Sequence, residues 1–564
     1  MTEGGEATTL NNIGELYSRI GQPQQALNYY NQVLPIVREV NDRRGEATTL
    51  SNIGLVYRII NQPTQAIARW QESVEITLEM RGGLLQENRQ QFLEANQGTS
   101  IALADLLIDQ KQPEKAFEWI NRVTTFELAE FSRLIDARVS NPEAQKLIDE
   151  WNQKIQQLNS LRQQAADNNY PVALQQTIID LEAETRRQAE EISRRFPEVA
   201  ELFETTPTDI NILRANIPAG TVVIQPVLLT NISNVPNTVA LFVLTQDELK
   251  VIKHPIEPKA FDQLVTDHYQ ALTGRGDDTA TGIQLYDILI RPIESQIQAL
   301  APKKLSIIAT GKLRYIPFET FYDSQKEEYL IEKYPINYLT RISARSLQET
   351  PNSTPSQGGI LGLGNPVPRY PQNLLGSEEE VKSITALFPG SASYLNSEAT
   401  LDRFKLQASR FPILHLATHG CFQPEGCPNI NLKANTILFA DTQFNIADAA
   451  LLGLNGTRLL TLSACQTALN TNSDGQEISG IAYIFERAGA RTVMATLWSV
   501  DDPATRDLMV QFYQNLNTGN MSTSEALRQA KISQIQAIND DGDENEKGFH
   551  PYYWSGFVLI GDGR

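Results

Sequence analysis

A repeat near the start of the chain limits most strongly what this sequence can fold into. The six residues Gly5–Leu10 recur unchanged at Gly45–Leu50, so the period is 40 residues. Further identical or similar residues share this offset: Asn12/Asn52, Ile13/Ile53, Gly14/Gly54, Tyr17/Tyr57, Gln22/Gln62, Pro23/Pro63, Ala26/Ala66 and Tyr30/Trp70. A weaker third copy contains Gln112-Pro113 and Ala116. A period of about 20–50 residues is typical of solenoid arrays, so this part of the chain is expected to be a stack of similar units.

Each unit has the pattern of two helices joined by a turn. Leu10, Ile13 and Tyr17 are three and four residues apart, which places them on one helical face. The Gln22-Pro23 step favours the start of a second helix, because the first helical turn does not need the N–H that proline lacks. The pattern resembles the tetratricopeptide repeat, although the usual period is about 34 residues. Such arrays present a concave surface to other proteins. We therefore expect the repeats to bind a regulatory protein or the substrate; a spacer or packing platform is the alternative.

The middle of the chain indicates a helical hairpin, and the remainder an α/β domain. Apolar residues recur every three or four positions in the polar stretch that begins at residue 136. From residue 206 short β-type runs take over, and later continuous apolar runs alternate with helical segments. Such runs are typical of buried parallel strands, and the alternation indicates an open α/β sheet. We predict a multidomain chain with a mostly parallel sheet, divided into all-α repeats (1–135), a helical connector (136–205), a β-rich half (206–350) and an α/β half (351–564).

Two strand ends carry residues suited to nucleophilic catalysis. The apolar run 413–417 leads into His419-Gly420, and the run 459–462 leads into Cys465. Ligands of open α/β sheets bind beyond the carboxyl ends of the strands. A thiolate is a strong nucleophile, and an adjacent imidazole can activate it. The backbone N–H groups of Gly420 and Cys465 could both stabilise an oxyanion.

Four motifs in this region resemble the CHAT domain, a caspase-like cysteine peptidase domain found mostly in bacteria behind tetratricopeptide repeats. They are LHLATHG, NIADAALLGLNGTRLLTLSACQTA, FERAGARTVMATLWSVDDPATRDLM and HPYYWSGFVLIG. The resemblance covers 281–564 strongly and 206–280 loosely, where it implies a non-catalytic half that extends the sheet. It implies that His419 is the catalytic base and Cys465 the nucleophile. The sequence departs from the caspase signature after the cysteine, where Gln466-Thr467 replace Arg-Gly.

The pocket that selects the residue before the cleaved bond is less well marked. Trp498 and Asp501 lie in a segment that resembles one in separases, where an acidic residue selects a basic side chain. A buried carboxylate would favour Arg or Lys. Asp502 is also a candidate, but the alternative is that it caps the helix that follows. Two acidic residues after the nucleophile are rivals: Asp474 and Glu477.

Charge and composition exclude several classes of function. The chain has 48 Lys and Arg against 67 Asp and Glu, a net charge of −19, whereas nucleic acids and anionic membranes attract clustered positive charge. The start of the chain lacks a basic and apolar leader, and no apolar stretch of about 18 residues occurs. We therefore expect a cytoplasmic protein without a membrane span. Cys421 and Cys427 are expected to be free thiols in a reducing compartment, and with His419 they lack an ordered zinc-ligand spacing.

Other candidate sites are weaker still. The acidic stretch 540–544 lacks the pattern of a calcium loop. Gly362-x-Gly364 lacks the third glycine of a dinucleotide fingerprint. His415, inside the predicted strand, is expected to be a core residue or to support the site. We therefore expect no metal and no organic cofactor.

These observations predict a regulated cysteine endopeptidase that cleaves a protein substrate, with a basic residue before the cleaved bond as the candidate preference and with the repeats binding a partner or the substrate. Two alternatives remain open. One is a catalytically silent scaffold that binds partners through the repeats. The other is a different thiol chemistry, such as acyl transfer.

Overall fold

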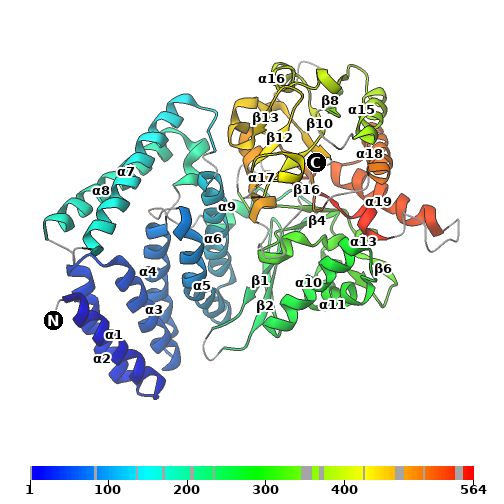
Figure 1. Cartoon of the computed structure of the whole chain (residues 1–564). Helices are drawn as coiled ribbons and strands as arrows, with labels where there is room; N and C mark the ends of the chain where they lie inside the picture. Colours follow the sequence, from blue (N-terminus) through cyan, green and yellow to red (C-terminus); the bar gives the residue numbers. More distant parts are fainter. Residues whose placement is uncertain are drawn as a thin grey trace. The chain divides into compact units, whose positions relative to one another are not determined.

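The chain forms two compact units in the computed structural model (Figure 1). The structure describes residues 3–81, 86–134, 137–167, 172–203, 209–232, 235–343, 358–366, 374–423, 426–463, 476–498, 502–539 and 550–564. The helical unit comprises Met1–Glu130, Asn141–Ile210 and Leu229–Asn237. The α/β unit comprises Phe131–Ser140, Asn211–Leu228 and Thr238–Arg564. Within the described parts, none of the helices combines the length and apolar character needed to span a bilayer.

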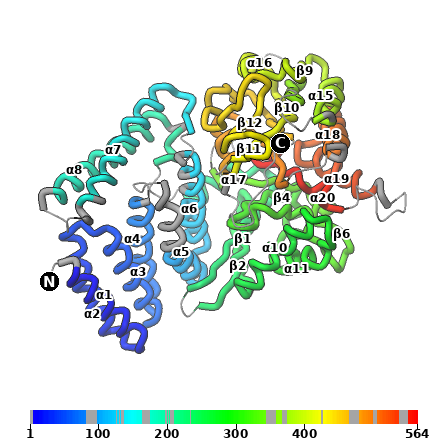
Figure 2. The backbone as a smooth tube through the Cα atoms, viewed as in Figure 1, coloured from blue at the N-terminus to red at the C-terminus, as the bar shows by residue number. Residues whose placement is uncertain are grey.

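The repeats fold as predicted, into pairs of antiparallel helices. The helices of this region are α1 (Glu3–Arg19), α2 (Pro23–Glu39), α3 (Arg43–Ile59), α4 (Pro63–Arg81), α5 (Gln86–Asp109) and α6 (Pro113–Leu134). A helix begins at the proline of each Gln-Pro step, as predicted: α2 at Pro23, α4 at Pro63 and α6 at Pro113. The helical hairpin follows as α7 (Pro142–Asp167), α8 (Val172–Arg195) and the short 3₁₀ helix η1 (Pro197–Leu202). Figure 2 traces this path along the chain.

A glycine facing an aromatic ring explains the strongest part of the repeat. A Cβ atom on Gly14 would lie 2.7 Å from a ring carbon of Tyr30, and one on Gly54 would lie 2.5 Å from the ring of Trp70. Both rings are about 1% exposed, and the Trp70 indole N–H donates to the carbonyl oxygen of Ser51 at 3.0 Å. Each helix pair can therefore close only because the glycine has no side chain.

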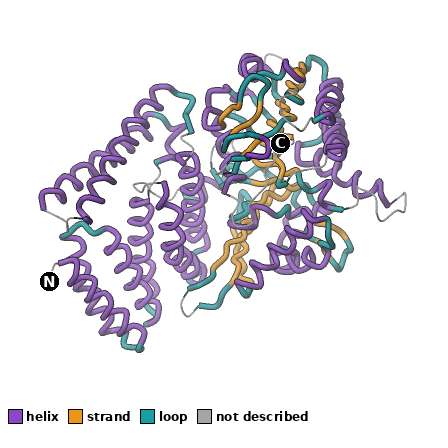
Figure 3. Tube along the Cα trace, in the orientation of Figure 1, coloured by secondary structure: helices purple, strands orange, loops and turns teal. Residues whose placement is uncertain are grey.

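The α/β unit is built on one mixed sheet, coloured orange in Figure 3. Within the described residues its strand order is β3-β2-β1-β4-β7-β16-β15-β14-β10-β8-β9. The strands are β1 (Thr221–Leu229), β2 (Thr238–Leu244), β3 (Leu249–Pro255), β4 (Lys304–Ile307), β7 (Ile336–Tyr338), β8 (Ile360–Gly364), β9 (Ala392–Leu395), β10 (Ile413–Ala417), β14 (Leu459–Ser463), β15 (Thr492–Thr496) and β16 (Phe557–Gly561). The pairs β2–β3 and β15–β16 are antiparallel, whereas the pairs from β1 through β4 to β7 and β16, and from β15 through β14, β10 and β8 to β9, are parallel. The prediction of an α/β domain with a mostly parallel sheet is confirmed.

One sheet spans both predicted halves of this region. The strand β7, from the half before residue 350, pairs with β16 at the end of the chain, with Tyr338 opposite Ile560. Two smaller sheets accompany it: β11 (Gly420–Cys421), β12 (Thr436–Leu438) and β13 (Gln443–Asn445) form one, and β5 (Tyr322–Asp323) and β6 (Glu328–Tyr329) the other. The strands before residue 350 therefore belong to the same sheet as those after it.

Helices cover both faces of the sheet. Successive residues of a strand point to opposite sides, so strands that are apolar throughout need cover on each face. Ile413 and Leu459 pack in one apolar cluster with Leu508, whereas their neighbours Leu414 and Leu460 pack in another. The helices are α9 (Ile210–Arg214), α10 (Pro258–Gly274), α11 (Thr279–Leu289), α12 (Glu294–Leu300), α13 (Leu330–Lys333), α15 (Leu375–Leu387), α16 (Leu401–Gln407), α17 (Gln476–Ala488), α18 (Asp502–Asn517), α19 (Thr523–Asn539) and α20 (Pro551–Trp554). The face with α15 and α18 belongs to the first cluster, and the face with α17 to the second.

Candidate active site

The register of β10 and β14 aligns the two strand ends that the predicted catalytic residues follow. The two strands are parallel, and their last residues, Ala417 and Ser463, are opposite each other. One residue further, the Thr418 N–H donates to the Ser463 carbonyl oxygen at 3.1 Å. His419 therefore follows directly on a contact with the end of β14. Cys465, two residues beyond Ser463, lies outside the described residues.

The backbone around His419 is held by the small sheet. The Leu438 N–H donates to the His419 carbonyl oxygen at 2.8 Å, and the Thr418 hydroxyl donates to the Leu438 carbonyl oxygen at 2.8 Å. The next pair of this antiparallel ladder is Gly420 opposite Ile437. Since hydrogen-bonded and non-hydrogen-bonded pairs alternate in such a ladder, the Gly420 N–H is directed away from β12. The His419 side chain is 6% exposed.

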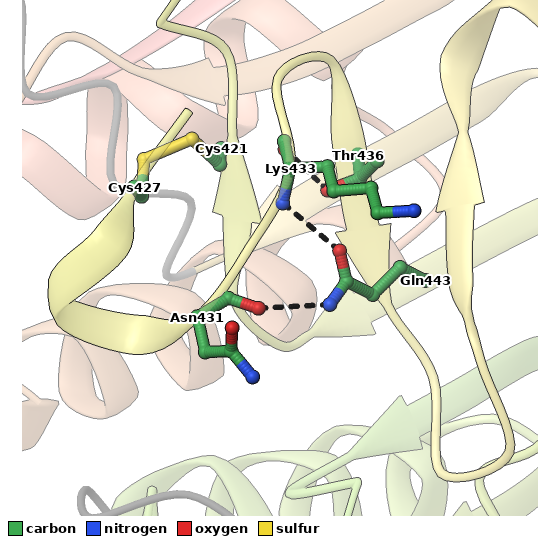
Figure 4. Close-up of a disulfide and its surroundings, with 6 residues drawn as sticks. All are labelled: Cys421, Cys427, Asn431, Lys433, Thr436 and Gln443. Carbon is green, nitrogen blue, oxygen red and sulfur yellow. Dashed lines mark hydrogen bonds between the residues drawn. A yellow bond between two sulfur atoms is a disulfide. The ribbon is translucent and has the colours of Figure 1, made fainter. Parts of the chain in front are cut away.

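A disulfide lies two residues after His419 (Figure 4). Cys421 and Cys427 are joined, with their Cα atoms 5.8 Å apart, so the prediction that both are free thiols is wrong. Between the two cysteines the Gly426 N–H donates to the Gln423 carbonyl oxygen at 3.0 Å, and this turn brings Cys427 back toward Cys421 at the end of β11.

The loop beyond the disulfide is closed by the side-chain amide of Gln443 (Figure 4). Its nitrogen donates to the Asn431 carbonyl oxygen at 2.8 Å, and its oxygen accepts from the Lys433 N–H at 2.9 Å. The Thr436 hydroxyl donates to the Lys433 carbonyl oxygen at 2.7 Å. The segment after His419 is therefore fixed by one covalent bond and by polar contacts from β12 and β13.

A buried polar network lies beside the ends of β10 and β14. The Glu380 carboxylate of α15 accepts from the Ser463 hydroxyl at 3.0 Å and lies 2.8 Å from Nε2 of His415. Nδ1 of His415 is 3.1 Å from the Tyr513 hydroxyl, which is 2.9 Å from the Thr461 hydroxyl. None of the five side chains is more than 1% exposed, and burial raises the pKa of Tyr513. Sequence reasoning placed His415 in or beside the core but missed Glu380.

The residues predicted for substrate selection are only partly within the described chain. Trp498 is 3% exposed: its indole N–H donates to the Tyr552 carbonyl oxygen at 3.1 Å, and its ring stacks on the Tyr552 ring with centroids 6.2 Å apart. Asp501 lies outside the described residues, and α18 begins at Asp502. Of the two rival residues, Asp474 lies outside the described residues, and only the backbone of Glu477 is described, as part of α17.

Other predicted features are placed as follows. The acidic stretch 540–544 lies outside the described residues. Gly362 and Gly364 lie in β8, where a Cβ atom on either would come within 3.0 Å of the Val381 side chain. These glycines therefore permit α15 to approach the sheet. In the ranges that the structure describes, no group of three or more His, Cys, Asp or Glu side chains is arranged to hold a metal ion.

Comparison with known families agrees with this organisation. The family model described as the CHAT domain matches residues 279–562. The chain belongs to the CHAT domain family. A tetratricopeptide repeat model matches residues 5–79, so a CHAT domain follows an N-terminal repeat array in this chain.

Curated relatives and solved structures give more distant likenesses to this CHAT protein. Tetratricopeptide repeat protein 28 of Mus musculus is 23% identical over 329 residues, and that of Homo sapiens is 24% identical over 334. Each match covers 49% of this chain and 13% of the relative, so the chain spans a small part of these relatives. A separase–securin complex of Saccharomyces cerevisiae is similar with a TM-score of 0.39, 11% identity and coverage of 98% of this chain and 49% of that one. The Arg-specific cysteine proteinase gingipain R is similar with a TM-score of 0.33 and 8% sequence identity, and the match covers 54% of this chain and 74% of that one.

Proposed function

We propose that this protein is a cysteine endopeptidase in which Cys465 is the nucleophile and His419 the general base. The observation that carries the proposal is the pairing of Ala417 with Ser463 at the ends of β10 and β14. Both candidate residues follow these paired ends by two positions. Membership of the CHAT domain family supports the same assignment.

The proposed reaction follows from the chemistry of the two groups. His419 takes the thiol proton, and the Cys465 sulfur attacks the carbonyl carbon of the cleaved peptide bond. His419 then protonates the leaving amine, and water hydrolyses the thioester to release the acid and restore the thiol. The Gly420 N–H, directed away from β12, and the Cys465 N–H would donate to the oxyanion. No cofactor takes part in this scheme.

The proposed preference for a basic residue before the cleaved bond rests on Asp501. Its carboxylate would pair with Arg or Lys of the substrate. Trp498 is buried against Tyr552, so its proposed contribution is to support the segment that carries Asp501. Asp502 begins α18, where an acidic residue also favours the helix terminus. The expected result of Asp501→Asn is a loss of preference for Arg and Lys, measured with peptide pairs that differ only at that position.

The repeats are proposed to bind a regulatory protein or the substrate. Leu16 of α1 and Ile20, the residue that follows this helix, are 57% and 56% exposed. Exposed apolar side chains that lie together often mark protein contacts. Leu16→Glu with Ile20→Glu in the full chain is expected to weaken any change in peptidase activity that a protein partner produces. Activity on a short peptide should stay unchanged. An unaltered response to the partner would refute a role for this surface.

The protein is further proposed to act in the cytoplasm, as the sequence suggests. Thiol reductants keep most cytoplasmic cysteines reduced, so in that compartment the bond between Cys421 and Cys427 would be open in part of the molecules. Trapping free thiols in intact cells, followed by mass spectrometry, measures that fraction. Complete oxidation of this pair in every molecule would contradict the cytoplasmic location.

The decisive test of the proposed function is the pH profile of Cys465 alkylation. With the Cys421–Cys427 disulfide intact, Cys465 is the one remaining cysteine of the three in the sequence, so the reaction needs no separation from other thiols. We expect an apparent pKa well below the free-thiol value of about 8.5 and an upward shift in His419→Ala. An ordinary thiol that is indifferent to His419 would refute the dyad and favour the silent scaffold. Cleavage of a protein substrate that is lost in Cys465→Ala separates proteolysis from acyl transfer.

A further inference from the structure

Three consecutive glutamates of α15 have three different environments. Glu378 pairs with Lys382 at 2.6 Å near the surface. Glu379 pairs with Arg506 at 3.0 Å and has a side chain that is 67% exposed. Glu380 is 1% exposed and faces the sheet. A buried carboxylate is costly unless hydrogen bonds compensate for the lost water, so the position of Glu380 needs an explanation that its two neighbours do not.

The contacts of Glu380 lead to the end of β14. The Ser463 hydroxyl donates to its two oxygens at 3.0 and 3.4 Å. The carboxylate is the partner of the buried Ser463 hydroxyl, so this contact favours one orientation of the Ser463 side chain. The carboxylate also lies 2.8 Å from Nε2 of His415 in β10. Glu380 therefore joins the two strands from one side of the sheet.

Ser463 is also bound through its backbone. Its carbonyl oxygen accepts from the Thr418 N–H at 3.1 Å, and Thr418 directly precedes His419. The side chain of Ser463 is thus held by Glu380 while its main chain holds the segment that leads to the proposed base. Cys465 follows Ser463 by two positions. Ser463 thus contacts the residue before the proposed base and precedes the proposed nucleophile by two positions.

We propose that Glu380 is a positioning residue for the dyad, which acts through the Ser463 hydroxyl to set the start of the Cys465 segment against the His419 segment. This inference rests on the proposed function. The contacts of Glu380 are with Ser463 and His415, so its proposed role is to position the reacting groups and not to react. Its expected effect is on the geometry of the dyad, and hence on the reactivity and acidity of the thiol.

A merely structural role makes a different prediction. If Glu380 only fixed α15 to the sheet, removing another hydrogen bond of the same buried network would reduce the reactivity of Cys465 by a similar factor. Thr461 offers the matched comparison, because it lies on the same strand two residues before Ser463 and its buried hydroxyl contacts Tyr513 instead of Glu380. Thr461→Val therefore removes a network hydrogen bond without breaking the link to Glu380.

The test measures Cys465 alkylation against pH in the full chain with the disulfide intact. The variants are Glu380→Gln, Ser463→Ala, their combination, Thr461→Val and Glu379→Gln. We expect Glu380→Gln and Ser463→Ala each to lower the alkylation rate near neutral pH at least tenfold and to move the apparent pKa toward that of a free thiol. The double variant should lose no more than the larger single effect, because both changes break one link. Thr461→Val and Glu379→Gln should stay within twofold of the wild type.

The outcomes separate this inference from the proposed function. A wild-type thiol that is unaffected by His419→Ala refutes the dyad and the inference together. A reactive, His419-dependent wild type with an unchanged Ser463→Ala profile refutes the inference alone. An equal loss in Thr461→Val and Ser463→Ala would also refute it, since the network would then act only as packing. If Glu380→Gln fails to fold, Ser463→Ala still decides, because it leaves the carboxylate in contact with His415.

Discussion

Opening the Cys421–Cys427 disulfide should lower the stability of the α/β unit by a calculable amount. The two cysteines are six residues apart in sequence. For a loop of this length, the chain entropy that a disulfide removes from the unfolded state amounts to about 2 kcal/mol. In a domain of several hundred residues, this free energy corresponds to a decrease of about 3 °C in melting temperature.

The assay compares thermal unfolding of the oxidised wild type, the same protein with excess dithiothreitol, and the Cys421→Ser/Cys427→Ser variant. Reductant should lower the melting temperature of the wild type to that of the variant. It should not change the variant, whose one cysteine is Cys465. Equal melting temperatures for the oxidised wild type and the variant would refute the reasoning. So would a variant that loses stability in reductant by the same amount as the wild type.

Two further predictions concern glycine packing and a buried histidine. Gly54→Ala should cost roughly 1–3 kcal/mol, because the new Cβ atom would come 2.5 Å from the Trp70 ring. Gly98→Ala, which meets nothing within 4 Å, should be neutral or stabilise its helix by up to about 1 kcal/mol; urea unfolding of both variants checks this. Burial lowers the pKa of His268 to about 4 in the folded state, whereas the unfolded value is about 6.5. Protonation therefore favours the unfolded chain, and the free energy of unfolding decreases as the pH falls from about 6.5 toward 4, by roughly 3 kcal/mol in total. Urea unfolding between pH 7 and 4 should therefore show a smaller loss in His268→Gln than in the wild type, and an equal loss would contradict the prediction.

Much of the fold could be predicted because its determinants are local in the sequence. A glycine on one helix and an aromatic residue on the next, as in Gly54 and Trp70, recur at a constant offset, and their packing requires both. The central strands are buried on both faces, so they appear as continuous apolar runs. His419 and Cys465 could be predicted to belong to one site for the same reason, since each follows such a run. These signals lie within a few dozen residues of one another.

The rest depends on contacts that no local pattern encodes. The spacing of Cys421 and Cys427 does not distinguish a bond from two thiols, and in the structure a turn between them, where the Gly426 N–H donates to the Gln423 carbonyl oxygen, accompanies the bond.

Glu380 is the clearer case. In the sequence it is the third of three glutamates in a helix, a pattern that normally indicates a solvated face. Its burial follows from the close approach of α15 to β8, which Gly362 and Gly364 permit because a Cβ atom on either would meet Val381. The glycines that resembled part of a nucleotide-binding motif therefore have a packing role. They allow a carboxylate to reach Ser463 at the end of β14, which connects a feature of the core to the proposed chemistry of the site.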